Sequence, residues 1–372
     1  MKIKSRLSLT SLQVQQKSKA NSKHFNYIIV DRAEFSNILN SIIIPGNTDI
    51  KSLPNLLTPL NKAIKELKPI KLFRYRTVND NNIDALESDS VYTVTADMFN
   101  DPYDSLFQYD LNQVESIIRN TANVDFLRVI QTIFKSGDFN ADILRCFPNG
   151  ELNVALENLC KTDLSDSDEI NSRLENMASV IITLIKAIAP MIEIQLRNAV
   201  TYACFSEKVD SITMWSHYTN YHEGYALGYS NDILSFEQMN MLKCGLFPVI
   251  YSESRYNGSS LFAWAIYNAL GWQMIEPDKL AIIKAGLHKS TDWSYENEWR
   301  LICSIPQQER SFPKVTPVTI CPNEIYYGTR ISKENKARLH SIAVNKNLTE
   351  FDMGIDNASG NYQMIVKPAI FQ

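Results

Sequence analysis

The sequence predicts an α+β fold, in which a mixed or antiparallel β-sheet carries a helical insertion. Two stretches, 71–104 and 201–372, alternate short strand-like runs with turn residues, whereas residues 105–200 lack strong strand runs and show helical periodicity. The chain has 372 residues, more than one core comfortably holds. We therefore expect an N-terminal extension over 1–70, a β-rich core domain over 71–104 and 201–372, and a helical insertion over 105–200.

The composition is that of an ordinary globular protein. Hydrophobic residues make up 45% and charged residues 21%, which excludes a disordered chain. With 37 basic and 41 acidic residues, the net charge is −4, which argues against a surface that binds nucleic acid throughout but allows a local basic groove. The six cysteines form no CxxC pair, so we expect small, buried, reduced thiols in a cytoplasmic protein.

The N-terminal extension begins with a polar stretch, 1–24, in which every charged side chain is basic. We interpret it as a leader, with an arm that binds nucleic acid as the alternative. A strand-like run follows at 26–30. A helix is predicted over 53–69, because leucine and isoleucine recur there at helical spacing before Pro69.

The remaining elements follow from the same patterns. Strands are predicted at 71–78, 91–96, 201–206, 224–230, 246–252, 298–305, 324–330 and 363–370. Helices are predicted at 111–122, 124–136, 169–200, 259–271 and 333–348.

The most apolar part of the insertion is 177–194, which contains Lys186, Pro190 and Glu193. A charge at the middle of a membrane span costs about 2.5–3.5 kcal/mol, so we expect a buried, proline-kinked helix and no membrane association. In a homo-oligomer, the helical insertion would supply the contact between subunits.

Four short groups of residues suggest chemistry, although the chain has no phosphate-binding loop, dinucleotide fingerprint or zinc-protease motif. In the first group, Arg74 and Arg76 stand at i and i+2 of a strand and share a face. Two guanidinium groups on one face can bind phosphate or carboxylate, and the alternative is a solvated strand face. The second group, 99–104, predicts a turn in which Asp101 or Asp104 would orient an arginine of the site, the alternative being a turn alone.

The third group combines Ser206 with aromatic residues that follow it. Trp215, Tyr218 and His222 present flat rings that can stack on a nucleobase or nicotinamide. His217 could act as an acid or base near neutral pH. The alternative is a core tryptophan beside a hydrogen-bonded histidine. A Ser–His–Asp hydrolase is disfavoured because nothing places Ser206 on a nucleophile elbow.

The fourth group contains Tyr295, Glu296 and Glu298, at the entry to a strand. On an extended segment the two carboxylates face one side, and their repulsion raises one pKa or demands a cation, which the arginine pair of the first group would supply. Such carboxylates can stabilise positive charge at a sugar anomeric carbon, polarise a ribose hydroxyl or activate a nucleophile. The alternative is a structural Glu–Arg pairing across strands.

Together these groups resemble a bacterial family known as domain of unknown function 2971. The resembling motifs span roughly 71–331 and are LFRYR, FNDPYD, CFSEKVDSITMWSHYTNYHEGYALGY, KSTDWSYENEWRLI and NEIYYGTRIS. The family name implies no established activity.

A second resemblance is to ADP-ribosyltransferases, whose functional residues follow the order Arg, Ser, Glu; it implies a split β-sheet that uses NAD as a substrate. Arg74 would match the arginine that holds the NAD phosphates, and Ser206 the serine that supports the nicotinamide pocket. Glu298 would match the glutamate that binds the ribose 2′-OH and stabilises the oxocarbenium-like transition state, and Glu296 the glutamate on the acceptor side. The family's Ser-Thr-Ser run is Cys-Phe-Ser here, at 204–206.

The leading hypothesis is therefore an enzyme that uses NAD, without a metal, for ADP-ribosyl transfer to a protein or nucleic acid or for NAD glycohydrolysis. A role in phage defence or as a toxin is expected only from the kind of gene that such bacterial families resemble. The expected catalytic residues are Glu298, Glu296 and His217. The expected cofactor-binding residues are Arg74, Arg76, Ser206, Trp215, Tyr218, His222 and Tyr295.

Two other functions stay open. In a metal-dependent enzyme that processes nucleic acid, Asp101, Glu296 and Glu298 would hold Mg²⁺, and the arginines, Arg300 among them, would line a phosphate track. In a non-catalytic sensor, a nucleotide would bind and the helical insertion would transmit the signal.

Overall fold

The computed structural model describes residues 30–136, 151–163, 165–230, 243–269, 275–305 and 314–371. The predicted leader, 1–24, and nearly all of the strand-like run at 26–30 lie outside the described residues.

One large sheet forms the centre of the described structure, which confirms the α+β class. Its strands are β1 (Lys71–Arg76), β2 (Ser90–Val94), β3 (Val200–Ser206), β4 (Tyr225–Ser230), β5 (Cys244–Pro248), β8 (Glu298–Ser304), β9 (Val315–Thr319), β10 (Glu324–Tyr327), β11 (Thr349–Ile355) and β12 (Met364–Pro368). Their order is β12-β11-β10-β4-β1-β3-β2-β9, with β8 paired to β3 and β5 paired to β8. Only the β10–β11 pair among these is parallel, so the sheet is mixed. A short parallel pair, β6 (Ile250–Ser252) with β7 (His288–Ser290), stands apart.

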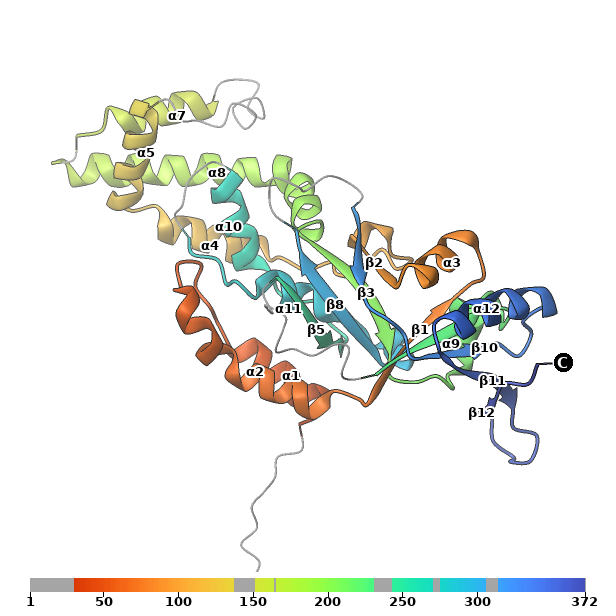
Figure 1. The fold of residues 1–372 in the computed structure, drawn as a ribbon. Helices are drawn as coiled ribbons and strands as arrows, with labels where there is room; N and C mark the ends of the chain where they lie inside the picture. The colour runs from red at the N-terminus through yellow and green to blue at the C-terminus, as the bar shows by residue number, and fades with distance from the viewer. Residues whose placement is uncertain are drawn as a thin grey trace, which may run out of the picture.

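The sheet divides where β1 meets β3. Along its whole length β1 pairs with β4, and along its whole length β3 pairs with β8, but β1 and β3 share a single register pair, Phe73 with Ser206. Figure 1 shows the β3–β8 part and the β10–β12 part running away from each other on either side of this junction. Beyond this pair the backbones of β1 and β3 separate. A cavity can therefore form between the two strands.

The main core lies between this sheet and helices on its surface. Helices α1 (Arg32–Ser41) and α2 (Leu53–Leu67) bury apolar residues against it, among them Phe35, Leu60 and Ile64. A proline in the first turn of α2 removes an N–H that would have no acceptor within the helix. The helix ends two residues before Pro69. The described part of the N-terminal extension thus packs into the same core as the sheet.

A second core belongs to the helical region. Helices α4 (Leu111–Thr121), α5 (Val124–Ser136), α7 (Glu151–Cys160) and α8 (Ser167–Arg197) lie together at one end of the molecule (Figure 1). Asp166 caps α8 by accepting hydrogen bonds from the next turn, and Met177, Ile181 and Ile192 of α8 are buried in this core. Helix α10 (Ser259–Ala269), from much later in the chain, packs into the same core. Within the described ranges, no helix has the length and apolarity to cross a membrane.

Several elements were not predicted. They are the helices α1, α3 (Asp80–Glu87), α7, α9 (Ile212–Tyr218) and α11 (Ala281–Leu287) and the strands β7, β9 and β11, while α12 (Lys333–Asn345) was expected. Most are too short to show a clear period. Strand β9 also contains Pro317, which fits only because β9 is an edge strand paired to β2 alone.

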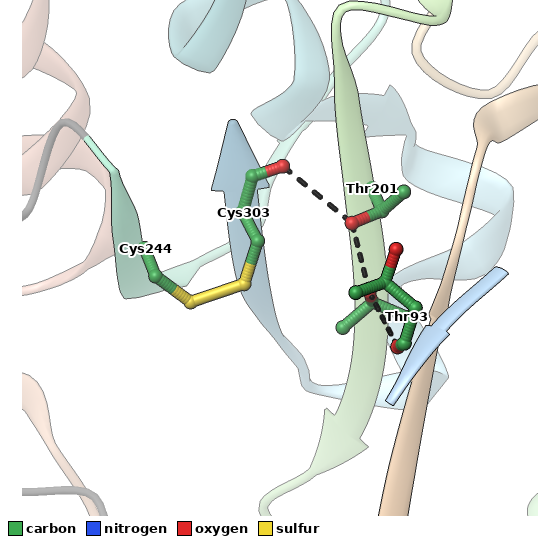
Figure 2. The surroundings of a disulfide bond; sticks show 5 residues. Thr93, Thr201, Cys244 and Cys303 are labelled. Atoms are coloured by element: carbon green, nitrogen blue, oxygen red, sulfur yellow. Dashed lines mark hydrogen bonds between the residues drawn. A yellow bond between two sulfur atoms is a disulfide. The ribbon is translucent and has the colours of Figure 1, made fainter. Parts of the chain in front are cut away.

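The expectation of reduced cysteines is wrong for one pair. Cys244 of β5 and Cys303 of β8 are direct register partners and form a disulfide, so the bridge crosses two antiparallel strands. Figure 2 shows the bridge beside β3, where Thr201 donates a hydrogen bond to the Cys303 carbonyl and accepts one from Thr93 of β2. The free cysteines of the described chain are Cys160, Cys204 and Cys321.

Candidate functional site

A cavity of about 570 Å³ opens at the junction of β1 and β3. Its walls come from β1, β3, the first residue of β8, helix α9, the segment after β2, and the 3₁₀ turn η5 (Thr291–Glu296) that precedes β8. Ligand pockets typically have volumes of about 300–1,000 Å³, so this one can accommodate a nucleotide. Seven of the ten expected site residues line it: Arg74, Arg76, Ser206, His217, Tyr218, Glu296 and Glu298.

Arg74 and Arg76 line this cavity, and neither forms an ion pair within the described chain. Their register partners on β4 are Leu227 and Tyr225. Arg74 is only 7% exposed, its guanidinium lies 5.4 Å from the centre of the Phe205 ring, and its Nε has no hydrogen-bond partner. No carboxylate of the described chain forms an ion pair with either arginine. A buried, unpaired guanidinium attracts an anion strongly, because the surrounding protein screens its charge poorly.

The two glutamates belong to a buried cluster of five charged groups. Lys289 Nζ donates to Glu296 Oε2 at 2.5 Å and to Glu298 Oε2 at 2.9 Å. Arg300 donates from Nε to Glu298 Oε1 at 2.8 Å and holds Asp104 with both terminal nitrogens, at 2.6 and 2.7 Å. All five side chains are at least nine-tenths buried. Three carboxylates and two cations give this cluster a formal charge of −1.

This cluster corrects one expectation and supports another. The cations that neutralise Glu296 and Glu298 are Lys289 and Arg300, and not the arginines of β1. Lys289 lies on β7, which immediately precedes η5 in the chain, and Arg300 lies two residues after Glu298 on β8. The expectation that Asp104 orients an arginine is confirmed, with Arg300 as that arginine.

The two glutamates do not stand on an extended segment. Glu296 ends η5, Glu298 begins β8, and Asn297 between them has left-handed backbone angles, φ 44° and ψ 52°. The turn at Asn297 brings both carboxylates to Lys289. Ser206, opposite Glu298 in the β3–β8 register, donates from Oγ to the Glu296 carbonyl at 2.6 Å. Ser206 therefore ties the end of β3 to the turn that positions Glu296.

The environment separates the pKa values of the two carboxyl groups. Burial, followed by the negative charge of Glu298, raises the pKa of Glu296 to about 7 despite its contact with Lys289. Burial also acts on Glu298, but the charges of Arg300 and Lys289 outweigh it and hold the pKa of Glu298 well below its ordinary value. Glu298 is therefore a permanent carboxylate, whereas Glu296 can gain and lose a proton near neutral pH.

The aromatic residues of helix α9 complete one wall. Tyr218 donates from its hydroxyl to Glu296 Oε1 at 2.6 Å. Burial first, and then the charge of Glu296, raises the pKa of Tyr218 far above its ordinary value, so the phenol stays protonated. His217 lines the cavity, and its Nδ1 lies 3.1 Å from the hydroxyl of Tyr295, which stands outside the cavity wall.

Trp215 and His222 lie outside the cavity, as the structural alternative expected. Trp215 is fully buried, donates from Nε1 to the Val209 carbonyl at 2.6 Å and stacks on His222, whose Nε2 lies 3.2 Å from Ser216 Oγ. His222 ends three consecutive residues with left-handed backbone angles, and a Cβ at Gly224 would lie 2.1 Å from the Arg76 carbonyl oxygen. This motif therefore builds the turn that carries the chain from α9 to β4.

The sequence did not predict a role for Lys289, nor for Arg32 and Tyr251, which form hydrogen bonds with the backbone of Glu298. Arg32 of α1 donates to the carbonyl oxygens of Val249 and Glu298, at 2.6 and 3.0 Å, and to Glu207 Oε1 at 2.6 Å. The Glu298 amide donates to the Tyr251 hydroxyl at 2.7 Å. No local pattern marks these residues, since they come from separate segments and meet only in the fold.

The expected magnesium ligands are not assembled. Within the described ranges, no group of three or more His, Cys, Asp or Glu side chains is placed to hold a metal ion. Asp101 instead accepts a hydrogen bond from the Tyr103 amide within its turn, and Glu296 and Glu298 already bind Lys289. Arg300 is buried in ion pairs and is unavailable to a phosphate track.

Comparison with known proteins gives one match. Residues 214–301 match the model of a family described as protein of unknown function, DUF2971, whereas no curated protein and no solved structure matches the chain. The matched segment runs from α9 to β8 and includes His217, Tyr218, Lys289, Glu296 and Glu298, while the arginines of β1 and Ser206 precede it. The resemblance stated from the motifs is confirmed over residues 214–301, where the chain matches the model of the DUF2971 family.

Proposed function

We propose that this protein is an NAD-using enzyme that catalyses ADP-ribosyl transfer or NAD glycohydrolysis. The observation that carries the proposal is the cavity at the sheet junction, which gathers Arg74 and Arg76 of β1 with Glu296 and Glu298 from a distant stretch of chain. A ligand with phosphates at one end and a reacting sugar at the other would meet both cations and carboxylates there.

The chemistry assigns a role to each charged group. The unpaired guanidinium groups of Arg74 and Arg76 would bind the pyrophosphate. As the nicotinamide–ribose bond breaks, its electron pair leaves with nicotinamide and positive charge develops on the ribose. The ionised Glu298 would offset that charge. Glu296, in its deprotonated form, would take the proton of the attacking hydroxyl or water.

Removal of the charge on Glu298 tests the proposal. In Glu298→Gln, NAD turnover is expected to fall by about 10³-fold, the typical effect of losing one electrostatic contact to the transition state. Nicotinamide release by the full chain, followed by chromatography, measures it, and a thermal melt of the variant checks its fold.

A matched control is Glu324→Gln. Glu324 is also buried, binds Lys71 Nζ at 2.6 Å and the Tyr326 hydroxyl at 2.7 Å, and lies outside the cavity. This control is expected to keep turnover within about threefold of the wild type, since it touches no reacting group. Equal turnover in Glu298→Gln and the wild type would exclude Glu298 from the mechanism.

A second function has its own support. Because Lys289 and Arg300 occupy the oxygens of Glu298, and Glu298 is only 2% exposed, the site could bind a nucleotide without turning it over. Such a protein would bind NAD in calorimetry and release no nicotinamide. The turnover assay therefore separates the sensor from the enzyme.

A further inference from the structure

A second, smaller cavity lies against the same two arginines. Its volume is about 60 Å³, and Arg74, Arg76 and Tyr92 line both cavities. The other walls of the small cavity come from helix α3, the turn into β2, and the face of β4 that carries Tyr225 and Tyr229. The arginine side chains of β1 therefore stand between two separate spaces.

The small cavity is polar and positively charged. Arg76 lines it together with Arg74, Tyr225 and Tyr229. The polar residues Ser90 and Asn82 also line it. Its carboxylate, Asp89, is neutralised by Lys346, whose Nζ lies 2.8 Å from Asp89 Oδ1.

Its size and charge select the ligand. A buried water needs about 10–15 Å³ of such space, so the cavity has room for about four water-sized atoms, which is the bulk of the four oxygens of a phosphate group. Arg74 is more than nine-tenths buried, has an Nε without a hydrogen-bond partner and lacks a carboxylate within the described chain. A buried guanidinium in this condition needs an anion with several acceptor atoms.

We propose that the small cavity under helix α3 is a phosphate subsite, separate from the large cavity and formed by Arg74 and Arg76 with the polar groups around them. The phosphate is either a free anion or a phosphomonoester that branches from a nucleotide in the large cavity, and this second source rests on the proposed function.

Calorimetric titration of the full chain with inorganic phosphate at constant ionic strength tests the subsite. Ala85 of α3 lines the small cavity and not the large one, so Ala85→Leu fills the subsite alone. Asn81→Leu adds a similar side chain to the exposed face of the same helix. Phosphate binding is expected to weaken at least about tenfold in Ala85→Leu and to change less than about twofold in Asn81→Leu, while melting curves confirm that both variants fold.

Titration with NAD and with its 2′-phosphorylated form, NADP, distinguishes the two sources. If the phosphate branches from the nucleotide, NADP binds about tenfold tighter than NAD, and Ala85→Leu removes the difference. If the phosphate is a free anion, NAD and NADP bind with the same affinity. The subsite is refuted if phosphate gives no binding heat and NADP has no advantage, or if Ala85→Leu binds phosphate as the wild type does. Phosphate binding by a chain that neither binds nor consumes NAD would overturn the proposed function and leave the subsite in place.

Discussion

Arg74 carries a buried charge that no carboxylate of the described chain neutralises. Its guanidinium has the Phe205 ring beside it but no carboxylate within the described chain, so part of the cost of its desolvation is uncompensated. In Arg74→Leu, we expect the free energy of unfolding to rise by about 1 kcal/mol, since removing an unpaired buried polar group recovers that cost. The same variant is expected to lose phosphate binding.

Urea denaturation of the full chain measures the change in the free energy of unfolding, and calorimetric titration with phosphate measures the loss of binding. Arg338→Leu is the control, because Arg338 is half exposed in an ion pair with Asp80 and should change stability by less than about 0.5 kcal/mol. A clear loss of stability in Arg74→Leu would mean that the arginine supports the fold.

Glu296 makes stability depend on pH in a known direction. Burial, and then the charge of Glu298, raises its pKa from 4.5 to about 7, so the folded protein holds a proton there that the unfolded chain has released. Its contribution to stability is complete below pH 4.5 and is lost as pH rises through about 7. Glu298, whose pKa is lowered, contributes in the opposite sense, and its contribution is lost only as pH falls below its ordinary value.

The variant Glu296→Gln, which stays neutral at every pH, isolates this effect. The stability of the variant relative to the wild type is expected to increase between pH 5 and pH 8 by on the order of 1–3 kcal/mol. Denaturant melts of both proteins at a series of pH values measure the difference. Parallel stability curves across this range would show that Glu296 has an ordinary pKa.

At the scale of elements, helix α1 holds the strand that carries Glu298. Arg32 bridges the carbonyl oxygens of Val249 and Glu298 to Glu207. In Arg32→Ala, we expect a loss of about 2 kcal/mol in stability, since two buried carbonyl acceptors and a carboxylate lose their donor. Arg32→Lys should recover only part of it, because one ammonium group cannot span three acceptors as the planar guanidinium does. Equal stability of Arg32→Ala and wild type in thermal melts would contradict this role.

Elements with a long or simple pattern were predicted, and the others were not. Helices α2 and α8 repeat apolar residues over several turns, and β3 and β8 are short runs rich in apolar and aromatic residues, so these patterns alone identify them. Helix α9 has seven residues and only Met214 and Trp215 buried, which is too little for a period to appear. Without that helix, the sequence could not show that Trp215 enters the core while His217 lines the cavity.

For the whole molecule, the disulfide joins positions far apart in the chain. Cys244 and Cys303 are separated by 59 residues, which include α10 and α11 of two different cores. Closing a loop of this length stabilises the fold by about 4 kcal/mol in the chain-entropy account. Replacing both cysteines by alanine is therefore expected to lower the free energy of unfolding by about that amount in non-reducing buffer.

The same loss is expected when wild-type protein is unfolded in the presence of a reductant, and mass spectrometry counts the free thiols. Cys321→Ser, at an exposed free cysteine, is the control and should leave stability unchanged. A wild-type stability that is indifferent to reductant would show that the bridge is not closed in solution.

The sequence by itself determined the α+β class, the main helices and strands, and seven of the residues that line the cavity, because strand periodicity and side-chain chemistry are local properties. Only the tertiary structure decided how the charges are divided. It paired Glu296 and Glu298 with Lys289 and Arg300, left Arg74 and Arg76 without an ion pair to any carboxylate of the described chain, and placed Trp215 in the core. The physical reason is that an ion pair depends on distance in space. The turn at Asn297 brings Glu296 and Glu298 to Lys289, whereas the divergence of β1 from β3 at Phe73 and Ser206 leaves the arginines of β1 on the cavity.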